Sequence, residues 1–338
     1  MSRVRILTLF VALIAMAATI SACGGGDSDD PQAVVDDATL QGVESGDIDL
    51  SLGVDVEGKE GGHIDLSLSG PFRSESEADL PELDLTATAN GSLDGEKIDF
   101  DGGLTLLGEE AYVQYQGTEY EVDPTTFGFV KATLQQRAGV ESKSSEASAC
   151  QEAASDLSLG NFIDEAKSEG SVDVGGTETT KVSGDLNATE AIDAVIELSE
   201  DSACSEQLNA AGPVPSVAEL EKAKSQVQSS VKAAHVDLYV GDDDIVRRVE
   251  AQVTVEPSKG SAKGGAKSVE MNLDLTLTGV NEGQTISAPQ GAQPLRKLFL
   301  KLGVNPIELL ELAEGGVGGA GGGLNGLLEG LGGTGSTQ

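Results

Sequence analysis

The fold is decided by the stretch Asp47-Ile48-Asp49-Leu50-Ser51-Leu52-Gly53-Val54-Asp55-Val56-Glu57. Every second residue in it is aliphatic, and the residues between are acidic or small. Side chains of a strand point alternately to its two faces, so the pattern predicts one apolar and one hydrated face. Such strands are typical of an antiparallel sheet with one face in water.

The same alternation recurs on both sides of this strand. It predicts an N-terminal meander of six or seven antiparallel strands through residues 64–68, 83–89, 98–106 and 112–122. We expect turns at 58–62 and at Asn90-Gly91, and a strand end at Gly70-Pro71. Residues 236–240, 249–255 and 269–277 predict three further strands, with Ala288-Pro289 ending the sheet.

The middle of the chain is predicted to be mainly helical. Helices are expected over residues 31–45, 127–137 and 156–167, and a strand over 177–183. Asn187 with Glu190, and Ser216 with Glu219, are spaced as N-terminal caps of two more helices. Asn305-Pro306 predicts a last short helix.

The N-terminus has the layout of an exported lipoprotein. Arg3 and Arg5 precede an uncharged, mostly apolar run over residues 6–20, which is short for a membrane span. Ile20-Ser21-Ala22-Cys23 resembles the bacterial lipobox, which implies lipidation of Cys23 and anchoring to the membrane. We expect a signal peptide over 1–22, an acidic Gly/Asp tether over 23–33, one domain over 34–314 and a Gly-rich disordered tail over 315–338.

The other two cysteines, Cys150 and Cys204, are an even pair in a chain expected to be exported. Parity and an oxidising compartment predict a disulfide between them. Two free buried thiols are the alternative.

Composition excludes several classes of function. The net charge is −36, and it becomes −38 without Arg3 and Arg5, so the chain repels nucleic acid and anionic surfaces. His63 and His235 both lie in alternating strands and are interpreted as ordinary strand residues. No motif for a catalytic nucleophile, phosphate loop or metal site is present, so we expect no enzyme, no cofactor and no metal. Asp242-Asp243-Asp244 is interpreted as a solvated turn.

A family resemblance is carried by the order of several short segments. The segments 112–115 and 122–124 come first and are followed by a predicted helix. Residues 180–185 come next and precede a second predicted helix. The segments 236–243, 245–248 and 269–277 follow, and the order ends at 286–289. This order resembles the LppX/LprA/LprG-type lipoproteins of actinobacteria, within the LolA-like superfamily. The resemblance implies an α+β fold: a large curved antiparallel half-barrel sheet whose concave apolar face is covered by helices. It also implies a cavity for acyl chains, and transfer of a lipid or lipoglycan between envelope layers.

The functional hypothesis is therefore non-catalytic binding of a lipid or lipoglycan through its acyl chains. The protein would sit on the extracytoplasmic face of the cell membrane, with an envelope transporter as partner. The expected cavity wall consists of aliphatic residues of the alternating strands: Leu50, Leu52, Val54, Leu66, Leu68, Leu85, Leu238, Val253, Leu273 and Leu275. The competing hypothesis is a surface lipoprotein that binds other proteins, with a filled core and no ligand.

Overall fold

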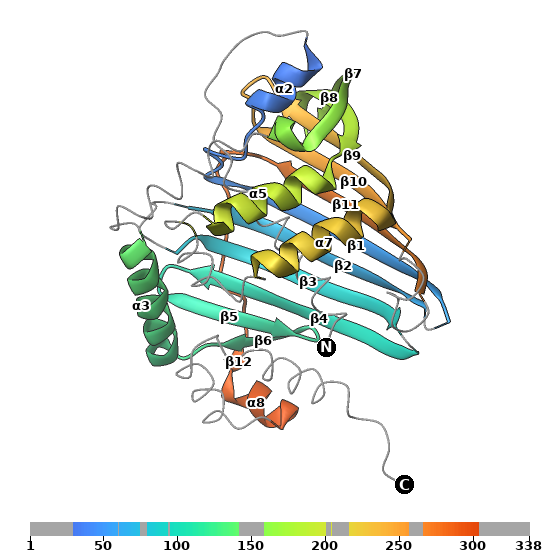
Figure 1. Cartoon of the computed structure of the whole chain (residues 1–338). Coiled ribbons are helices and arrows are strands. Elements are labelled where there is room, and N and C mark those ends of the chain that lie inside the picture. Colours follow the sequence, from blue (N-terminus) through green and yellow to red (C-terminus); the bar gives the residue numbers. More distant parts are fainter. Residues whose placement is uncertain are drawn as a thin grey trace.

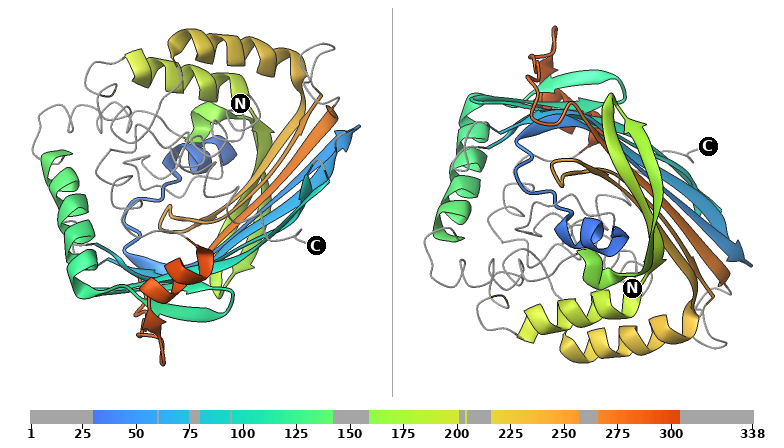
Figure 2. Two further views of the ribbon diagram at one scale, coloured as in Figure 1. Left: turned by 90° about the horizontal axis from the view of Figure 1, so that it is seen from below. Right: turned by 90° about the horizontal axis from the view of Figure 1, so that it is seen from above.

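The computed structural model describes residues 30–59, 61–74, 80–93, 95–141, 159–200, 204, 216–256 and 266–303. Within these ranges twelve strands form one sheet in the order β12-β6-β5-β4-β3-β2-β1-β11-β10-β9-β8-β7. All neighbouring strands are antiparallel except β12 and β6. The sheet is open and curved, and helices lie on its concave side (Figures 1 and 2), which confirms the expected architecture.

The strands fall into two meanders. The N-terminal one contains β1 (Ser45–Gly58), β2 (Gly62–Arg73), β3 (Glu82–Leu93), β4 (Glu96–Leu107), β5 (Glu110–Tyr115) and β6 (Thr118–Glu121). The C-terminal one contains β7 (Ile163–Val174), β8 (Thr177–Leu186), β9 (Val231–Gly241), β10 (Val246–Val255) and β11 (Ala266–Thr278). Strand β1, the stretch quoted first, pairs with β2 on one side and with β11 on the other. It therefore joins the two meanders into one sheet.

The helices are α2 (Pro31–Asp37), α3 (Pro124–Glu141), the 3₁₀ turn η2 (Leu159–Phe162), α5 (Ala188–Glu200), α7 (Val217–Ser230) and α8 (Arg296–Leu302). In Figure 2, α2, α3, α5 and α7 lie on the concave side of the sheet. The cap of α5 is as predicted: the Glu190 N–H donates to Oδ1 of Asn187 at 3.1 Å. No described helix is both long and apolar enough to cross a membrane.

The core lies between α2 and the C-terminal meander. Val35 of α2 is fully buried against β8 and β9, where Val182 and Leu238 are 1% and 2% exposed. These side chains belong to the apolar face of the strands, so the apolar face is the concave one. α5 and α7 pack on each other, and Lys224 of α7 donates to the Asp193 carboxylate of α5.

The turn expected at Asn90-Gly91 and the strand end expected at Gly70-Pro71 are both wrong. Asn90-Gly91 lies inside β3 and Gly70-Pro71 inside β2, and the β3–β4 turn includes Gly95. Both glycines have positive φ, 142° at Gly91 and 139° at Gly70. A Cβ on either would lie 2.0 Å from a carbonyl oxygen of the neighbouring strand. These glycines therefore permit close contact between backbones within the sheet, where the sequence predicted a strand end at Gly70 and a turn at Gly91.

Three further expectations are corrected at the sheet edges. The described part of the range 156–167, where a helix is predicted, is instead the turn η2 followed by the start of β7. β7 is an edge strand that is exposed on both faces over most of its length. The sheet does not end at Ala288-Pro289, because β12 (Gln293–Pro294) pairs with β6. The helix predicted after Asn305-Pro306 lies outside the described residues, and α8 was not expected.

The lipobox with Cys23, the tether up to Asp29, and the Gly-rich tail also lie outside the described residues, as does Cys150. Cys204 is fully buried and disulfide-bonded. Its pairing with Cys150 stays a prediction.

Candidate functional site

The concave face of the sheet carries aliphatic rows that cross strand after strand. Pairing partners from β3 to β8 make up the first row: Ala87, Leu68, Leu50, Leu275, Val249, Leu238 and Val182. The row beside it runs from β3 to β9: Ala89, Leu66, Leu52, Leu273, Ala251 and Val236. A third runs from β2 to β9: Ile64, Val54, Met271, Val253 and Ala234. Side chains in paired positions lie about 4.5–5.5 Å apart, so the rows form one continuous apolar surface.

Burial changes along these rows. At the β8–β9 end, α2 covers them and the side chains are part of the filled core. In the middle of the sheet, Leu50, Leu52 and Leu273 are only partly buried. Among the described elements, the more extensive contacts between helices and strands involve β5, β7, β8 and β12, which lie toward the two edges. The aliphatic surface over β11, β1, β2 and β3 is thus the part of the concave face that the described helices cover least. We call it the central apolar face.

All ten predicted wall residues lie on the concave face of the sheet. Leu52 is paired with Leu66 on one side and with Leu273 on the other. Leu50 is paired with Leu68 and Leu275 in the same way. Leu238, Val253 and Val54 are at most 7% exposed. The other seven are partly buried: Leu50, Leu52, Leu66, Leu68, Leu85, Leu273 and Leu275.

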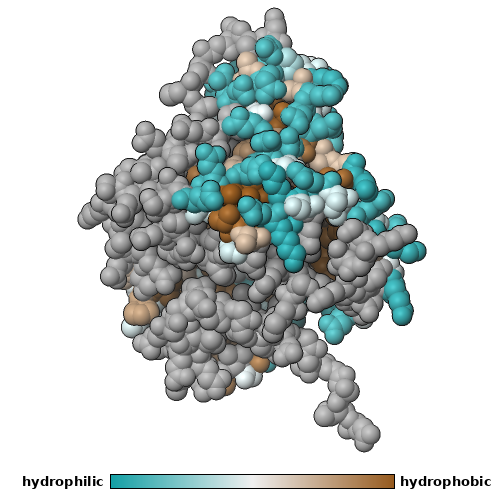
Figure 3. All heavy atoms as spheres, viewed as in Figure 1, coloured by the Kyte–Doolittle hydropathy of each residue, from teal (hydrophilic) through white to brown (hydrophobic). Residues whose placement is uncertain are grey.

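The predicted wall omitted two exposed residues of β4. Phe100 and Leu104 are 39% and 40% exposed. They pair with Ala89 and Leu85, so they extend the central apolar face by one strand. The Phe100 ring lies 6.4 Å from that of Tyr115 in β5. The period of two that identified the other residues also places these two on this face. Viewed from the helix side, Figure 3 shows apolar residues gathered near α5 and bordered by hydrophilic ones.

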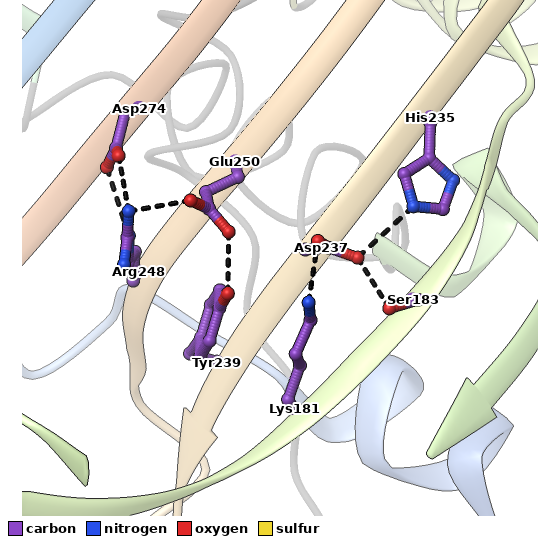
Figure 4. A network of polar contacts seen from close by, with 8 residues as sticks. All are labelled: Lys181, Ser183, His235, Asp237, Tyr239, Arg248, Glu250 and Asp274. Carbon is purple, nitrogen blue, oxygen red and sulfur yellow. Dashed lines mark hydrogen bonds and ion pairs between the residues drawn. The ribbon is translucent and has the colours of Figure 1, made fainter. Parts of the chain in front are cut away.

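The opposite, convex face is polar. Figure 4 shows a network across β8, β9, β10 and β11 in which every charged group drawn has a partner. Asp237 accepts from Ser183 at 2.5 Å and pairs with Lys181 at 2.9 Å. Burial alone raises the pKa of Asp237, but these two contacts outweigh it, so the pKa is lowered.

Tyr239 lies at the centre of this network and is 5% exposed. Lys181 Nζ and Arg248 Cζ lie 5.5 and 5.4 Å from its ring centroid, and its hydroxyl donates to Glu250 at 2.5 Å. Burial, and then the contact with Glu250, raises the pKa of Tyr239. These groups satisfy one another, and they hold the polar side of the C-terminal meander together.

A second polar contact on the convex face predicts a pH dependence. His63 Nε2 lies 2.6 Å from Asp65 Oδ2, and Nδ1 lies 2.8 Å from Asp55 Oδ1. Only a protonated imidazole can donate to both carboxylates, so these hydrogen bonds raise the pKa of His63. The hydrogen bond to Asp65 has the largest effect, followed by that to Asp55. The stabilisation is fully present below the unfolded pKa of about 6.5 and is lost as the pH rises through the folded pKa.

We therefore expect the melting temperature of the wild type to exceed that of His63→Gln by more at about pH 5 than at about pH 9. Subtracting the melting temperature of His63→Gln from that of the wild type at each pH removes the destabilising effect of the large negative charge, which is nearly the same in both proteins. A difference in melting temperature that is constant with pH would contradict this prediction.

No group of three or more His, Cys, Asp or Glu residues that could hold a metal ion occurs among the residues described. The rows that make up the central apolar face consist of apolar side chains, so these residues offer contact area and carry no charge.

No protein-family model matches the chain, and no curated protein matches it. Among solved structures, it is similar to LprF from Mycobacterium bovis, with 14% identity over 79% of this chain and 100% of that one, and a TM-score of 0.36. It is also similar to the Mycobacterium tuberculosis lipoprotein LppX, with 12% identity over 77% of this chain and 100% of that one, and a TM-score of 0.27.

A weaker likeness is to a putative outer membrane lipoprotein-sorting protein domain from Vibrio parahaemolyticus. There the identity is 9% over 71% of this chain and 87% of that one, and the TM-score is 0.15. The solved structures to which this chain is similar include LprF and the lipoprotein LppX, and LppX is one of the proteins that the segment order of the sequence resembles.

Proposed function

We propose that this protein is a lipid-anchored extracytoplasmic lipoprotein that binds a lipid or lipoglycan by its acyl chains, without catalysis. The observation that supports the proposal is the central apolar face. Its leucines form continuous rows across β11, β1 and β2, yet they remain partly exposed. Large contiguous apolar surfaces on a soluble protein usually mark an interaction site.

The chemistry of this face favours acyl chains over other small ligands. Binding to it is driven by the removal of apolar surface from water, and each methylene contributes roughly 0.8 kcal/mol. The partly exposed wall residues are aliphatic, so they offer no hydrogen bonds to a polar ligand. A ligand held there is chosen by its hydrocarbon part, and its polar head stays outside.

Anchoring rests on the sequence. Acylation of Cys23 would tie the domain to a membrane through a tether of Gly24-Gly25-Gly26-Asp27-Ser28-Asp29-Asp30. The bound lipid would then be received from, or delivered to, an envelope transporter as partner.

The proposal is tested by native mass spectrometry of the Cys23→Ala chain, purified from its own cells so that it has met the lipids of its own envelope. We expect a co-purifying lipid, and we expect Leu52→Phe/Leu273→Phe to lose it. These two residues are paired neighbours, so the added rings occupy the same part of the central apolar face. The matched control is Ser51→Phe/Asn272→Phe, which adds rings at exposed positions of the same two strands and should keep the lipid.

Two results would contradict the proposal. One is a wild-type mass without lipid together with a face filled by protein side chains, which would favour the protein-binding alternative. The other is equal loss of lipid in both double variants, because rings on the convex face cannot compete with a ligand on the concave one.

A further inference from the structure

Helix α8 differs in charge from the rest of this acidic chain. The chain contains 57 acidic and 21 basic residues, yet no acidic residue occurs between Gly283 and Ile307. Helix α8 falls in this stretch and reads Arg-Lys-Leu-Phe-Leu-Lys-Leu. Three of its seven residues are basic, and the other four are large and apolar.

The structure fixes α8 at one edge of the sheet. It follows directly after β12, which pairs with β6, and Figure 1 shows it beyond these strands at the lower end of the molecule. Leu298 is 5% exposed and holds the helix against the protein. Lys301 donates to Oε1 of Gln116 at 3.2 Å and lies 5.3 Å from the Tyr115 ring centroid. Gly303 ends the helix in a left-handed conformation, with φ of 68°.

The outward side of α8 is basic and apolar at once. Leu300 is 78% exposed, the highest value among the large hydrophobic residues described. Arg296 and Lys297 are also exposed, and within the described ranges neither has an acidic partner. The adjoining acidic residue of β6, Glu121, accepts the Leu295 N–H with its backbone carbonyl at 2.9 Å, and within the described residues its carboxylate forms no ion pair with α8. The two cations of α8 are therefore available for an external partner.

We propose that α8 docks on an anionic lipid bilayer, with Leu300 entering the interface and Arg296 and Lys297 contacting the headgroups. Interfacial helices combine exposed Leu or Phe with Lys or Arg in this way. Charges separated by more than about 10 Å are largely screened in salt, so a local basic site can bind although the protein as a whole is acidic.

Docking through α8 would also orient the molecule. An anionic membrane repels the carboxylates that cover the convex face, such as Asp49 and Asp55 of β1, which are exposed. The edge formed by β6 and β12 would then face the bilayer. This proposal does not depend on acyl-chain binding by the central apolar face.

The test is flotation with vesicles of the chain from Gly24 onward, which lacks both the apolar run over residues 6–20 and the lipidated Cys23, so that any binding comes from the protein surface. We expect binding to vesicles of equal parts phosphatidylglycerol and phosphatidylcholine, weaker binding as salt rises, and little binding to phosphatidylcholine alone. Arg296→Glu/Lys297→Glu should lower the affinity at least about tenfold, since each basic residue near an anionic surface contributes about 1 kcal/mol. Leu300→Ser should lower it at every salt concentration.

The matched control is Lys59→Glu/Lys97→Glu, which changes the net charge equally at two exposed positions, one in the turn after β1 and one near the start of β4. It should retain binding. Equal loss of binding in this control, or full binding by the α8 variant, would overturn the proposal. So would a salt-sensitive dimer formed without vesicles and lost in the α8 variant, because α8 would then bind a second copy of the chain. Lipid found by native mass spectrometry in the α8 variant would show that acyl-chain binding is separate from docking.

Discussion

Replacing Gly91 by alanine is expected to lower the free energy of unfolding by on the order of 3 kcal/mol. Gly91 has φ of 142°, a conformation that residues with a Cβ rarely adopt. An added Cβ would lie 2.0 Å from the carbonyl oxygen of His63 and 2.9 Å from Cα of Ile64. Both are backbone atoms of β2, so neither can move aside without separating the two strands. Natural domains are stable by only about 5–15 kcal/mol, so the loss is large.

The measurement is equilibrium unfolding in urea, compared with Gly53→Ala on β1, the strand that pairs with the other edge of β2. There the nearest atom to an added Cβ is Oδ1 of Asp65 at 3.7 Å, and φ is not positive. We expect Gly53→Ala to stay within about 1 kcal/mol of the wild type. Equal losses in the two variants would show that β2 and β3 are not in such close contact at Gly91.

Replacing Val35 by aspartate is expected to cost about 3 kcal/mol or more, or to prevent folding. Val35 is fully buried between α2 and the C-terminal meander, against side chains such as Val182 and Leu238. A carboxylate there would lie among aliphatic groups, and no cation is part of the cluster. The variant therefore reports whether α2 closes the β8–β9 end of the concave face.

Val35→Ala is the control, because it removes two methyl groups without adding a charge. We expect an intermediate loss of stability, read as the shift of the urea midpoint at unchanged slope. If Val35→Ala and Val35→Asp are both as stable as the wild type, then α2 is not packed on the sheet.

The sheet could be predicted from the sequence where one face is apolar and the other polar. Residues 47–57 and 269–277 alternate without interruption, and they form the paired strands β1 and β11 at its centre. Strand β7 could not be predicted, because an edge strand hydrated on both faces has no alternation. Asn90-Gly91 is predicted as a turn because Asn-Gly is common in hairpins. A glycine also occurs inside strands where two backbones approach closely, and the sequence alone does not distinguish these two uses.

The face on which each predicted wall residue lies could be predicted, but not which of these residues remain accessible. All ten predicted wall residues share the concave face because alternation determines the face of each. Whether a side chain on that face is covered depends on helices distant in sequence. Leu238 is buried because α2, two hundred residues earlier in the chain, packs over it, whereas Leu52 is left partly exposed. Periodicity carries no information on such long-range packing.

The most direct test of acyl-chain binding uses the absence of tryptophan from this chain. Leu52→Trp places a single fluorophore on the central apolar face, and Ser51→Trp places one on the convex face one residue away. Each protein is titrated with a fatty acid brominated along its acyl chain, which quenches tryptophan at close range. We predict strong, saturable quenching at position 52 and weak, non-saturating quenching at position 51. Absence of quenching at 52, or equal quenching at both positions, would contradict binding of acyl chains to the concave face.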